Sequence, residues 1–262
     1  MKIRHFLYNA FLVEDETIKI AIDPGQNLWL FNLHSLIPKK EWDSVTHVLV
    51  THGDPDHYYQ ADRVAIAANA PLIMNASMVK QEGSETCILV PRRGKVEFES
   101  FSGEFSTLNV GETLEINGAK ITAIKTQHGP IEYSILGFKR RRTPSPQERT
   151  GFGSIGFFID VNGKTVLNLG DSLIQQEWTG LKPDVLMLPI GGFGNSIWTM
   201  DVTDALQAVR LIAPKLVIPC HYNVPFILKK KFAQADDQYF KREVEKMGIE
   251  CRIMNSGDEI KI

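Results

Sequence analysis

Four side chains that commonly bind metal ions occur within six residues of this sequence, directly after a short apolar segment. The segment spans residues 45–50, and the cluster that follows it consists of His52, Asp54, Asp56 and His57. Imidazole nitrogens beside carboxylate oxygens suit Zn, Mn or Fe better than Ca or Mg. No cysteine lies in the cluster, which argues against a purely structural thiolate zinc site. The spacing therefore predicts a metal site that can support catalysis.

Three further residues of ligand type each stand directly after an apolar, strand-like segment. His128 closes KITAIKTQH, Asp171 closes TVLNLGD and His221 closes LVIPCH, which repeats the position of His52 after VLVT. Because functional sites in layered α/β proteins gather at strand ends, we expect these residues to meet the first cluster. The other three histidines occupy a strand interior, an aperiodic loop and a strand start, and we interpret them as structural: His5, His34 and His47.

The elements that must position these residues alternate between strands and helices along the chain. Apolar runs indicate strands across residues 3–22, and helical periodicity indicates helices at 60–69, 204–213 and 236–247. Two Asn-Gly pairs mark the tips of hairpins, which is the strongest short turn signal in a sequence. No low-complexity linker or internal repeat divides the chain. We therefore expect one domain over residues 1–262, with two sheets and helices outside them.

The composition limits the class of protein and its partners. A hydrophobic content of 43% over 262 residues supports a sizeable core, and a formal charge of −2 gives no global attraction to nucleic acid or to an anionic membrane. Three isolated cysteines without a CxxC pair are typical of a reduced intracellular protein. The first residues do not resemble a signal peptide, and no apolar stretch reaches roughly 18 residues, so we expect a cytoplasmic protein without membrane insertion. A homo-oligomer is compatible with this composition.

The whole set of motifs resembles the metallo-β-lactamase fold hydrolases. Their signature HxHxDH corresponds to residues 52–57, and His128, Asp171 and His221 follow in the family's order. The resemblance spans nearly the whole chain and implies an α/β (α+β) fold, a four-layer αββα sandwich. The segments GSIGFFI, LPIGG and IPCHYN are similar to the branch that holds ascorbate-6-phosphate lactonase-like and N-acylphosphatidylethanolamine phospholipase D-like hydrolases.

The resemblance also implies a dinuclear metal centre. Metal one would be bound by His52, Asp54 and His128, and metal two by Asp56, His57 and His221, with Asp171 bridging both. The family usually has His at the position of Asp54, and a carboxylate there adds a negative charge and a harder donor, which favours Mn or Fe over Zn. Such metals lower the pKa of bound water from ~16 toward ~7 and provide a metal-bound hydroxide as nucleophile. Asp56 is then the catalytic residue that orients the water and passes its proton to the leaving group.

Candidate substrate-binding residues fall in two regions. A polar insert at residues 132–153 has the composition of a mobile loop and carries Arg140, Arg141, Arg142 and Arg149. Such a run is either a solvated face or a clamp for an anionic group, which Arg binds in a bidentate way. A second group near the expected site loops either shapes a pocket or packs in the core: Trp198, Tyr222 and Asn223.

These observations predict a metal-dependent hydrolase that acts on an ester, lactone or phosphodiester of a small anionic molecule. Three alternatives stay open: a nuclease or phosphodiesterase acting on nucleic acid, a di-iron redox or sensing module, and a metal-binding domain without turnover. The charge of −2 argues against nucleic acid as a partner, and no flavodoxin-like segment is present to deliver electrons. A serine nucleophile elbow is excluded because GxSxG does not occur, and the glycine-rich run at 191–194 lacks the Lys-Ser or Lys-Thr of a phosphate-binding loop.

Overall fold

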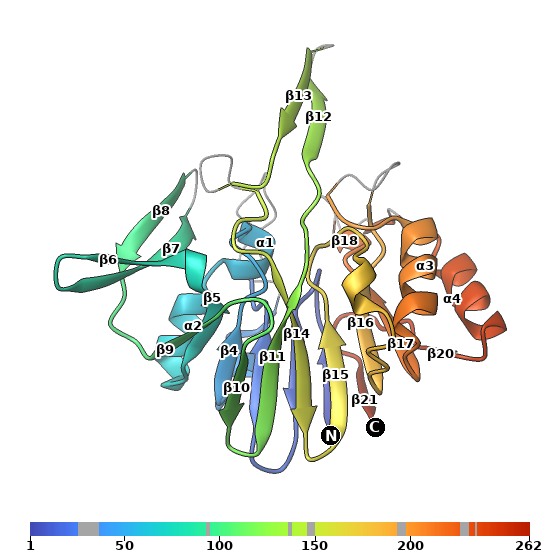
Figure 1. The fold of residues 1–262 in the computed structure, drawn as a ribbon, viewed down its shortest axis with the longest axis horizontal. Helices are drawn as coiled ribbons and strands as arrows, with labels where there is room; N and C mark the ends of the chain where they lie inside the picture. The colour runs from blue at the N-terminus through green and yellow to red at the C-terminus, as the bar shows by residue number, and fades with distance from the viewer. Residues whose placement is uncertain are drawn as a thin grey trace.

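A computed structural model describes the chain as two large β-sheets packed face to face, with helices on both outer sides (Figure 1). The described residues are 1–25, 37–92, 95–135, 138–145, 150–192, 198–225, 231–233 and 235–262. The layers follow the order helix, sheet, sheet, helix, which is the αββα arrangement that the sequence predicts. His34 lies outside the described part of the chain.

The first large sheet has seven strands, and its parallel part leads into the His52 cluster. In spatial order the strands are β21 (Glu259–Lys261), β1 (Lys2–His5), β2 (Phe11–Glu14), β3 (Lys19–Ile22), β4 (His47–Leu49), β5 (Leu72–Asn75) and β9 (Phe105–Leu108). The strands from β21 to β3 pair antiparallel, whereas those from β3 to β9 pair parallel. The segment after β4 therefore begins at the carboxyl edge of this sheet.

The second large sheet also has seven strands and contains both predicted hairpins. In spatial order the strands are β10 (Thr113–Ile116), β11 (Ala119–Lys125), β14 (Ile155–Val161), β15 (Lys164–Asn168), β16 (Val185–Pro189), β17 (Leu216–Cys220) and β20 (Glu250–Cys251). The hairpin tips are Asn117-Gly118 and Asn162-Gly163. Both residues of each pair have positive φ, as the two-residue turn between twisted strands requires. From β15 to β20 the pairing is parallel.

Helices cover the outer face of each large sheet. The α-helices are α1 (Pro55–Tyr58), α2 (Ala61–Ala68), α3 (Val202–Ile212) and α4 (Asp237–Lys246), and three short 3₁₀ helices span Lys39–Trp42, Ala76–Met78 and Gln176–Trp178. The three helices that periodicity predicts correspond to α2, α3 and α4, with ends shifted by one or two residues. The carboxylate of Asp201 caps α3 by accepting the N–H group of Thr203 at 2.8 Å. Within the described residues, no helix is long and apolar enough to cross a membrane.

Successive side chains along each strand point to opposite faces of the sheet, and this divides the core into layers. In β3, Ile20 and Ile22 face the space between the sheets, whereas Ala21 faces the helical side, and all three are fully buried. In β16, Val185 and Leu186 divide in the same way between the central core and the core under α3. Sheets that are apolar on both faces must be covered on both faces. This double layer fixes the strand ends that carry the candidate ligands.

Three smaller sheets extend from the two large ones. The first contains β6 (Val79–Glu82), β7 (Glu85–Arg92) and β8 (Lys95–Ser100), the second contains β12 (Ile131–Ile135) and β13 (Phe138–Arg142), and the third contains β18 (Asn223–Pro225) and β19 (Lys231–Ala233). The hairpin of β12 and β13 projects beyond the large sheets at the top of Figure 1.

The prediction of a mobile loop at residues 132–153 is wrong for its first part. β12 and β13 pair antiparallel, and the cross-strand neighbours Glu132 and Arg141 form an ion pair at 2.9 Å. Apolar residues alternate at positions 131, 133 and 135, a pattern that favours a strand. The following run of arginines obscured this pattern in the sequence. Arg149 lies outside the described residues.

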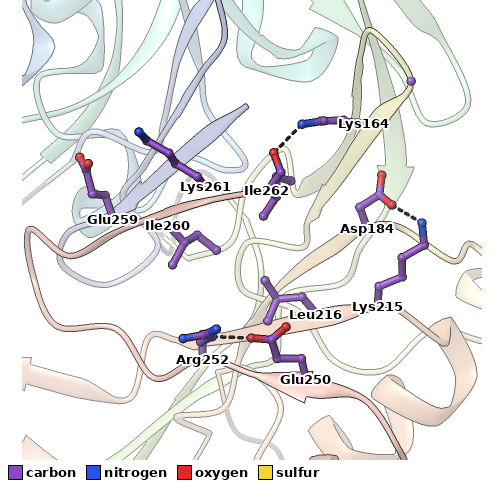
Figure 2. Close-up of a pocket in the computed structure, with 11 residues that line it drawn as sticks. Lys164, Asp184, Lys215, Leu216, Glu250, Arg252, Glu259, Ile260, Lys261 and Ile262 are labelled. Carbon is purple, nitrogen blue, oxygen red and sulfur yellow. Dashed lines mark hydrogen bonds and ion pairs between the residues drawn. The ribbon is translucent and has the colours of Figure 1, made fainter.

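A groove of about 650 Å³ lies at the amino ends of β15, β16 and β17, where their preceding residues line it (Figure 2). Figure 2 shows that Lys215 pairs with Asp184 and that Arg252 pairs with Glu250, while Lys164 donates to a backbone carbonyl. Ligands of open α/β sheets bind at the carboxyl ends of the strands, which is the opposite end. These paired charges make the groove a poor match for an anionic substrate.

Candidate metal centre

The seven candidate ligands come together at the carboxyl edges of the two large sheets. The segment that joins β4 to α1 carries His52, Asp54, Asp56 and His57, whereas β11 leads to His128, β15 to Asp171 and β17 to His221. Six of these side chains are buried, and Asp56 is half-buried. The strand ends that the sequence predicts to meet therefore do meet, although up to 169 positions separate them in the chain.

Two glycines let neighbouring loops approach the ligands closely. Gly25 donates its N–H to the carbonyl oxygen of His57 at 2.9 Å, and a Cβ atom there would lie 2.4 Å from the His57 carbonyl carbon. Gly151 has a φ of +51° and donates its N–H to Asp54 Oδ1 at 2.6 Å. A Cβ atom at Gly151 would lie 2.3 Å from the Cβ atom of His128. Both positions therefore require a residue without a side chain.

The candidate ligands of metal one form a compact group. Potential ligand atoms of His52, Asp54 and His128 all lie within 4.8 Å of one another. Asp54 Oδ2 stands 3.6 Å from His52 Nε2 and 3.3 Å from His128 Nε2. The carboxylate at the position where the resemblance predicts a histidine thus points into the group rather than away from it.

The candidate ligands of metal two form a second compact group beside the first. Ligand atoms of Asp56, His57 and His221 also lie within 4.8 Å of one another. Asp56 Oδ2 stands 3.1 Å from His221 Nε2 and 3.9 Å from His57 Nε2. The imidazole rings of His57 and His221 are nearly parallel, at an interplanar angle of 15°.

Asp171 lies between the two groups. Its Oδ2 atom is 3.4 Å from His221 Nε2, 3.7 Å from His57 Nε2 and 3.7 Å from His128 Nε2. The carboxylate therefore has ligand atoms of both groups as neighbours. This is the position that a ligand shared by two metal ions must occupy.

Several buried polar atoms at the centre have no hydrogen-bond partner among the described residues. They are His52 Nε2, His57 Nε2 and Asp171 Oδ1. A buried polar atom without a partner costs about 1–3 kcal/mol, so a group of them needs a physical explanation. Divalent cations satisfy lone pairs of this kind, and His/Asp donor sets suit Zn, Mn or Fe. The donor set therefore fits a metal centre.

Contacts on the far side of the imidazole orient the lone pairs of three of the four candidate histidines. His57 Nδ1 donates to Asp23 Oδ2 at 2.6 Å, His128 Nδ1 donates to the Gly129 carbonyl oxygen at 2.6 Å, and His52 Nδ1 lies 3.0 Å from Thr51 Oγ1. A proton on Nδ1 leaves the lone pair on Nε2, which faces the centre in all three residues. Such outer partners fix the tautomer and the ring orientation of metal-binding histidines.

Asp23 is a residue of the site that the sequence analysis did not identify. It is fully buried and has a φ of 45°. Besides the His57 imidazole, its carboxylate accepts Asn9 Nδ2 at 2.6 Å, the Thr51 N–H at 2.7 Å and the Thr51 hydroxyl at 2.6 Å. Its signal in the sequence is an acidic residue at the end of an apolar strand, the same pattern that identified Asp171.

The charges of the centre oppose the effect of burial. Burial by itself raises the pKa of Asp171, but the imidazoles of His221 and His57 hold it well below its usual range. Burial lowers the pKa of His57, whereas the carboxylates of Asp23 and Asp171 raise it above its usual value. For His128 burial outweighs the acidic neighbours, and the pKa is lowered. The carboxylate of Asp171 is therefore ionised at neutral pH, the state that binds cations.

The arginines proposed for substrate binding lie on the projecting hairpin. Arg141 is exposed and engaged with Glu132, and Arg142 is half-buried. Arg140 belongs to β13, but its side chain is outside the described part of the structure. The hairpin begins at Ile131, three residues after His128, so it emerges beside the candidate metal centre. Whether these residues contact a substrate stays a prediction.

The second group of candidate substrate-binding residues has different roles in the fold, since Trp198 supports a loop and Tyr222 packs in the core. The backbone of Trp198 bonds to Gly129 and Pro130, so it holds the loop that follows His128. Tyr222 is buried in the core under α3, and its hydroxyl donates to Asp237 at 2.9 Å. Asn223 lines a cavity of about 50 Å³ that also has His221 in its wall.

Comparison with known proteins agrees with this geometry. The Beta-lactamase superfamily domain matches residues 2–221, a range that contains all seven candidate ligands. A UPF0173 metal-dependent hydrolase from Nanoarchaeum equitans is 32% identical over 267 residues, which covers 99% of each chain. One from Pyrobaculum islandicum is 29% identical over 269 residues and covers 100% of each chain. Among solved structures, Igni18, a metallo hydrolase from Ignicoccus hospitalis, superimposes with a TM-score of 0.69 at 23% identity over 99% of this chain and 97% of that chain.

The fold and the His/Asp cluster therefore define a protein of the metallo-β-lactamase fold. Within that superfamily, the chain belongs to the UPF0173 family of metal-dependent hydrolases. The likeness to Igni18 shows the fold alone at this level of identity. The narrower resemblance to lactonase-like and phospholipase D-like hydrolases stays a prediction.

Proposed function

We propose that this protein is a hydrolase with a dinuclear metal centre between its two sheets. Metal one would be held by His52, Asp54 and His128, metal two by Asp56, His57 and His221, and both by Asp171. The observation that carries the proposal is the position of Asp171, whose Oδ2 atom has histidines of both groups within 3.7 Å and whose Oδ1 atom is one of the buried atoms without a partner among the described residues.

Asp56 has the properties of the residue that moves a proton in this reaction. The two ions, when bound, would supply a hydroxide nucleophile at neutral pH and positive charge for the developing oxyanion. Burial raises the pKa of Asp56, but His57 and His221 lower it below its usual value, so the carboxylate is ionised and can accept a proton. It is also the most exposed of the seven ligands, which lets it reach a leaving group.

The charge of the loaded centre bears on the charge of the substrate. Two divalent ions and the three carboxylates of Asp54, Asp56 and Asp171 would leave one net positive charge when the imidazoles are neutral, and the hydroxide would reduce it to zero. A histidine in place of Asp54 would leave one more positive charge. Asp54 thus weakens the attraction for anions and favours harder ions such as Mn or Fe. We propose a small anionic ester, lactone or phosphodiester as substrate, with the arginines of β13 as its contact.

The proposal is tested by metal content and turnover on the same preparations. Wild-type protein stripped of metal and reloaded with Zn, Mn or Fe should bind two ions per chain and hydrolyse a member of an ester, lactone and phosphodiester panel. Asp171→Ala should bind fewer ions and lose turnover by at least the ~10–100-fold that an outer partner costs. Asp43→Ala, at an exposed aspartate before the amino end of β4, is the matched control.

Each alternative function has its own result in this test. Fully loaded protein with no turnover on any substrate would make the chain a metal-binding domain. Tight RNA binding that weakens steeply with salt would favour a nuclease, because phosphate contacts release counterions. Purified protein that holds iron and changes its absorbance on reduction would favour a redox module. The first and third results would contradict the proposed hydrolase, and the second would replace the small anionic substrate by a nucleic acid.

A further inference from the structure

A reciprocal pair of amide side chains joins the two large sheets beneath the candidate metal centre. Asn9, in the turn between β1 and β2, donates from Nδ2 to Asn168 Oδ1 at 2.9 Å. Asn168, the last residue of β15, donates back from Nδ2 to Asn9 Oδ1 at 3.0 Å. Both side chains are fully buried, and 159 positions separate them in the chain. This pair is therefore a direct polar link between the halves of the molecule.

Further hydrogen bonds of the two amides lead to ligands of metal two. Asn9 Nδ2 also donates to Asp23 Oδ2 at 2.6 Å, and that carboxylate orients His57. Asn168 Oδ1 also accepts the N–H of Gly170 at 3.0 Å, and Gly170 immediately precedes the bridging carboxylate. One amide thus supports a ligand from the first sheet, and the other supports the ligand shared by both metals.

The turn that carries Asn9 also contacts the third histidine-bearing loop. The N–H of His221 donates to the Tyr8 carbonyl oxygen at 3.2 Å, and the two rings lie 5.3 Å apart. Cys220 Sγ donates to Asn9 Oδ1 at 3.5 Å. Tyr8 and His221 both have positive φ, at 53° and 54°. Residues other than glycine keep this costly conformation only where their surroundings determine it.

The hydrogen-bonding capacity of both amides is fully used. Asn168 Nδ2 makes its second contact with Met187 Sδ at 3.4 Å, so each amide uses two donors and two acceptor positions. Rotation of either amide would leave a buried polar group unpaired. Among the described residues, neither amide bonds to Asp54 or His128, and the network reaches His52 only through Asp23 and Thr51. The hydrogen bonds of the pair therefore lead more directly to the candidate ligands of metal two than to those of metal one.

We propose that Asn9 and Asn168 are positioning residues that set the geometry of metal two and tie it to the bridging carboxylate of Asp171. The inference rests on the proposed dinuclear centre. It assigns a role to two neutral side chains that bind no metal themselves. Loss of either amide should free His57, His221 and Asp171 to move independently, and leave the His52 group largely intact.

Stepwise metal affinity tests this inference without reference to turnover. Metal-free protein is titrated with Co²⁺ against a chelator, and the visible spectrum of each equivalent is recorded. His221→Ala, which removes one ligand of metal two, provides the reference for a chain with metal one alone. Asn9→Ala and Asn168→Ala should each weaken the second equivalent by ~10–100-fold and change its spectrum, with a smaller change in the first equivalent. Asn109→Ala, at an exposed position outside this network, is the matched control.

The double variant separates a network from two independent effects. Because the two substitutions share the Asn9–Asn168 pair, Asn9→Ala with Asn168→Ala should weaken metal two by less than the two single effects combined. Serine variants at both positions keep a small polar group and provide the same test where an alanine variant does not fold.

Three results would overturn the inference in distinguishable ways. If the wild-type protein binds fewer than two ions, both the dinuclear centre and the inference are wrong. If both single variants bind two ions with wild-type affinities, the inference about the amides is wrong and the dinuclear centre stands. Equal weakening of both equivalents, in step with a lower unfolding temperature of the metal-free protein, would show that the pair supports only the fold.

Discussion

Replacement of Asp23 by Asn should weaken metal binding although Asp23 is not expected to touch a metal. The side chain is fully buried, and its Oδ2 atom accepts hydrogen bonds from Asn9, Thr51 and His57, all at 2.6 Å. An asparagine has nearly the same shape but only one acceptor atom. Its amide oxygen can replace Oδ2, and its NH₂ group then meets the N–H of Thr51, which is also a donor. Asp23→Asn therefore removes the negative charge and one hydrogen bond at once.

The size of the effect follows from what Asp23 does for the imidazole. A hydrogen bond to a charged group contributes about 1.5–3 kcal/mol, roughly twice the value for a neutral pair. Outer partners of metal-binding histidines typically change affinity by ~10–100-fold, or about 1.4–2.7 kcal/mol. We expect Asp23→Asn to fall in this range at metal two, because His57 loses its charged partner. His52 should change less, since it reaches Asp23 only through Thr51.

The assay is competition between the metal-free protein and a chelator of known affinity. Asp43→Asn applies the same chemical change at an exposed aspartate and serves as the control. Circular dichroism of the metal-free forms shows that both variants are folded. The reasoning fails if folded Asp23→Asn binds both ions as tightly as the control. It also fails if metal one is weakened and metal two is not.

Three further predictions concern metal preference, substrate binding and pH. Asp54→His replaces a hard donor by an imidazole, so the affinity for Zn relative to Mn should rise in competition titrations, and an unaltered metal profile would mean that Asp54 is not a ligand. Joint replacement of Arg140, Arg141 and Arg142 by Ala should raise KM for a phosphorylated substrate more than KM for a neutral ester; equal KM values in variant and wild type would exclude the hairpin from the binding site. Burial lowers the pKa of His5, so the unfolded chain binds an extra proton as the pH falls below about 6.5, and stability then decreases by up to about 1.4 kcal/mol per pH unit. The free energy of unfolding of metal-free His5→Gln, measured with urea, should lack this loss at low pH. If it depends on pH as steeply in the variant as in the wild type, the prediction is wrong.

The meeting of the candidate ligands could be predicted from the sequence because their positions coincide with a regular feature of the fold. His52, His128, Asp171 and His221 each follow an apolar strand, and the carboxyl ends of these strands share one edge of the molecule. A side chain at such a position can be located without knowledge of the loops. The layers and the three longer helices were predictable for the same reason, since periodicity reports which faces are buried.

In the hairpin of β12 and β13, the alternating pattern predicts strands, whereas the charged composition predicts a loop. Its strands alternate between apolar and polar residues, yet the run of charge at Lys139 to Arg142 suggested a solvated loop. The cross-strand ion pair of Glu132 with Arg141 shows that these charges are compatible with strand pairing. Charge in a sequence therefore indicates exposure, and it does not by itself exclude regular structure.

The residues that were not predicted orient other residues and are not themselves candidate ligands. Asn9 and Asn168 are neutral amides, and their significance depends on a contact across 159 positions that no local pattern encodes. Asp23 is an acidic residue at a strand end, but no sequence motif links it with the residues that it contacts. Because these three side chains determine where imidazoles and carboxylates point, they can set metal affinity as strongly as the ligands' own identity. For a chain in which Asp54 replaces the histidine that the resemblance predicts, we expect metal preference to depend on this buried network as well as on the seven candidate ligands.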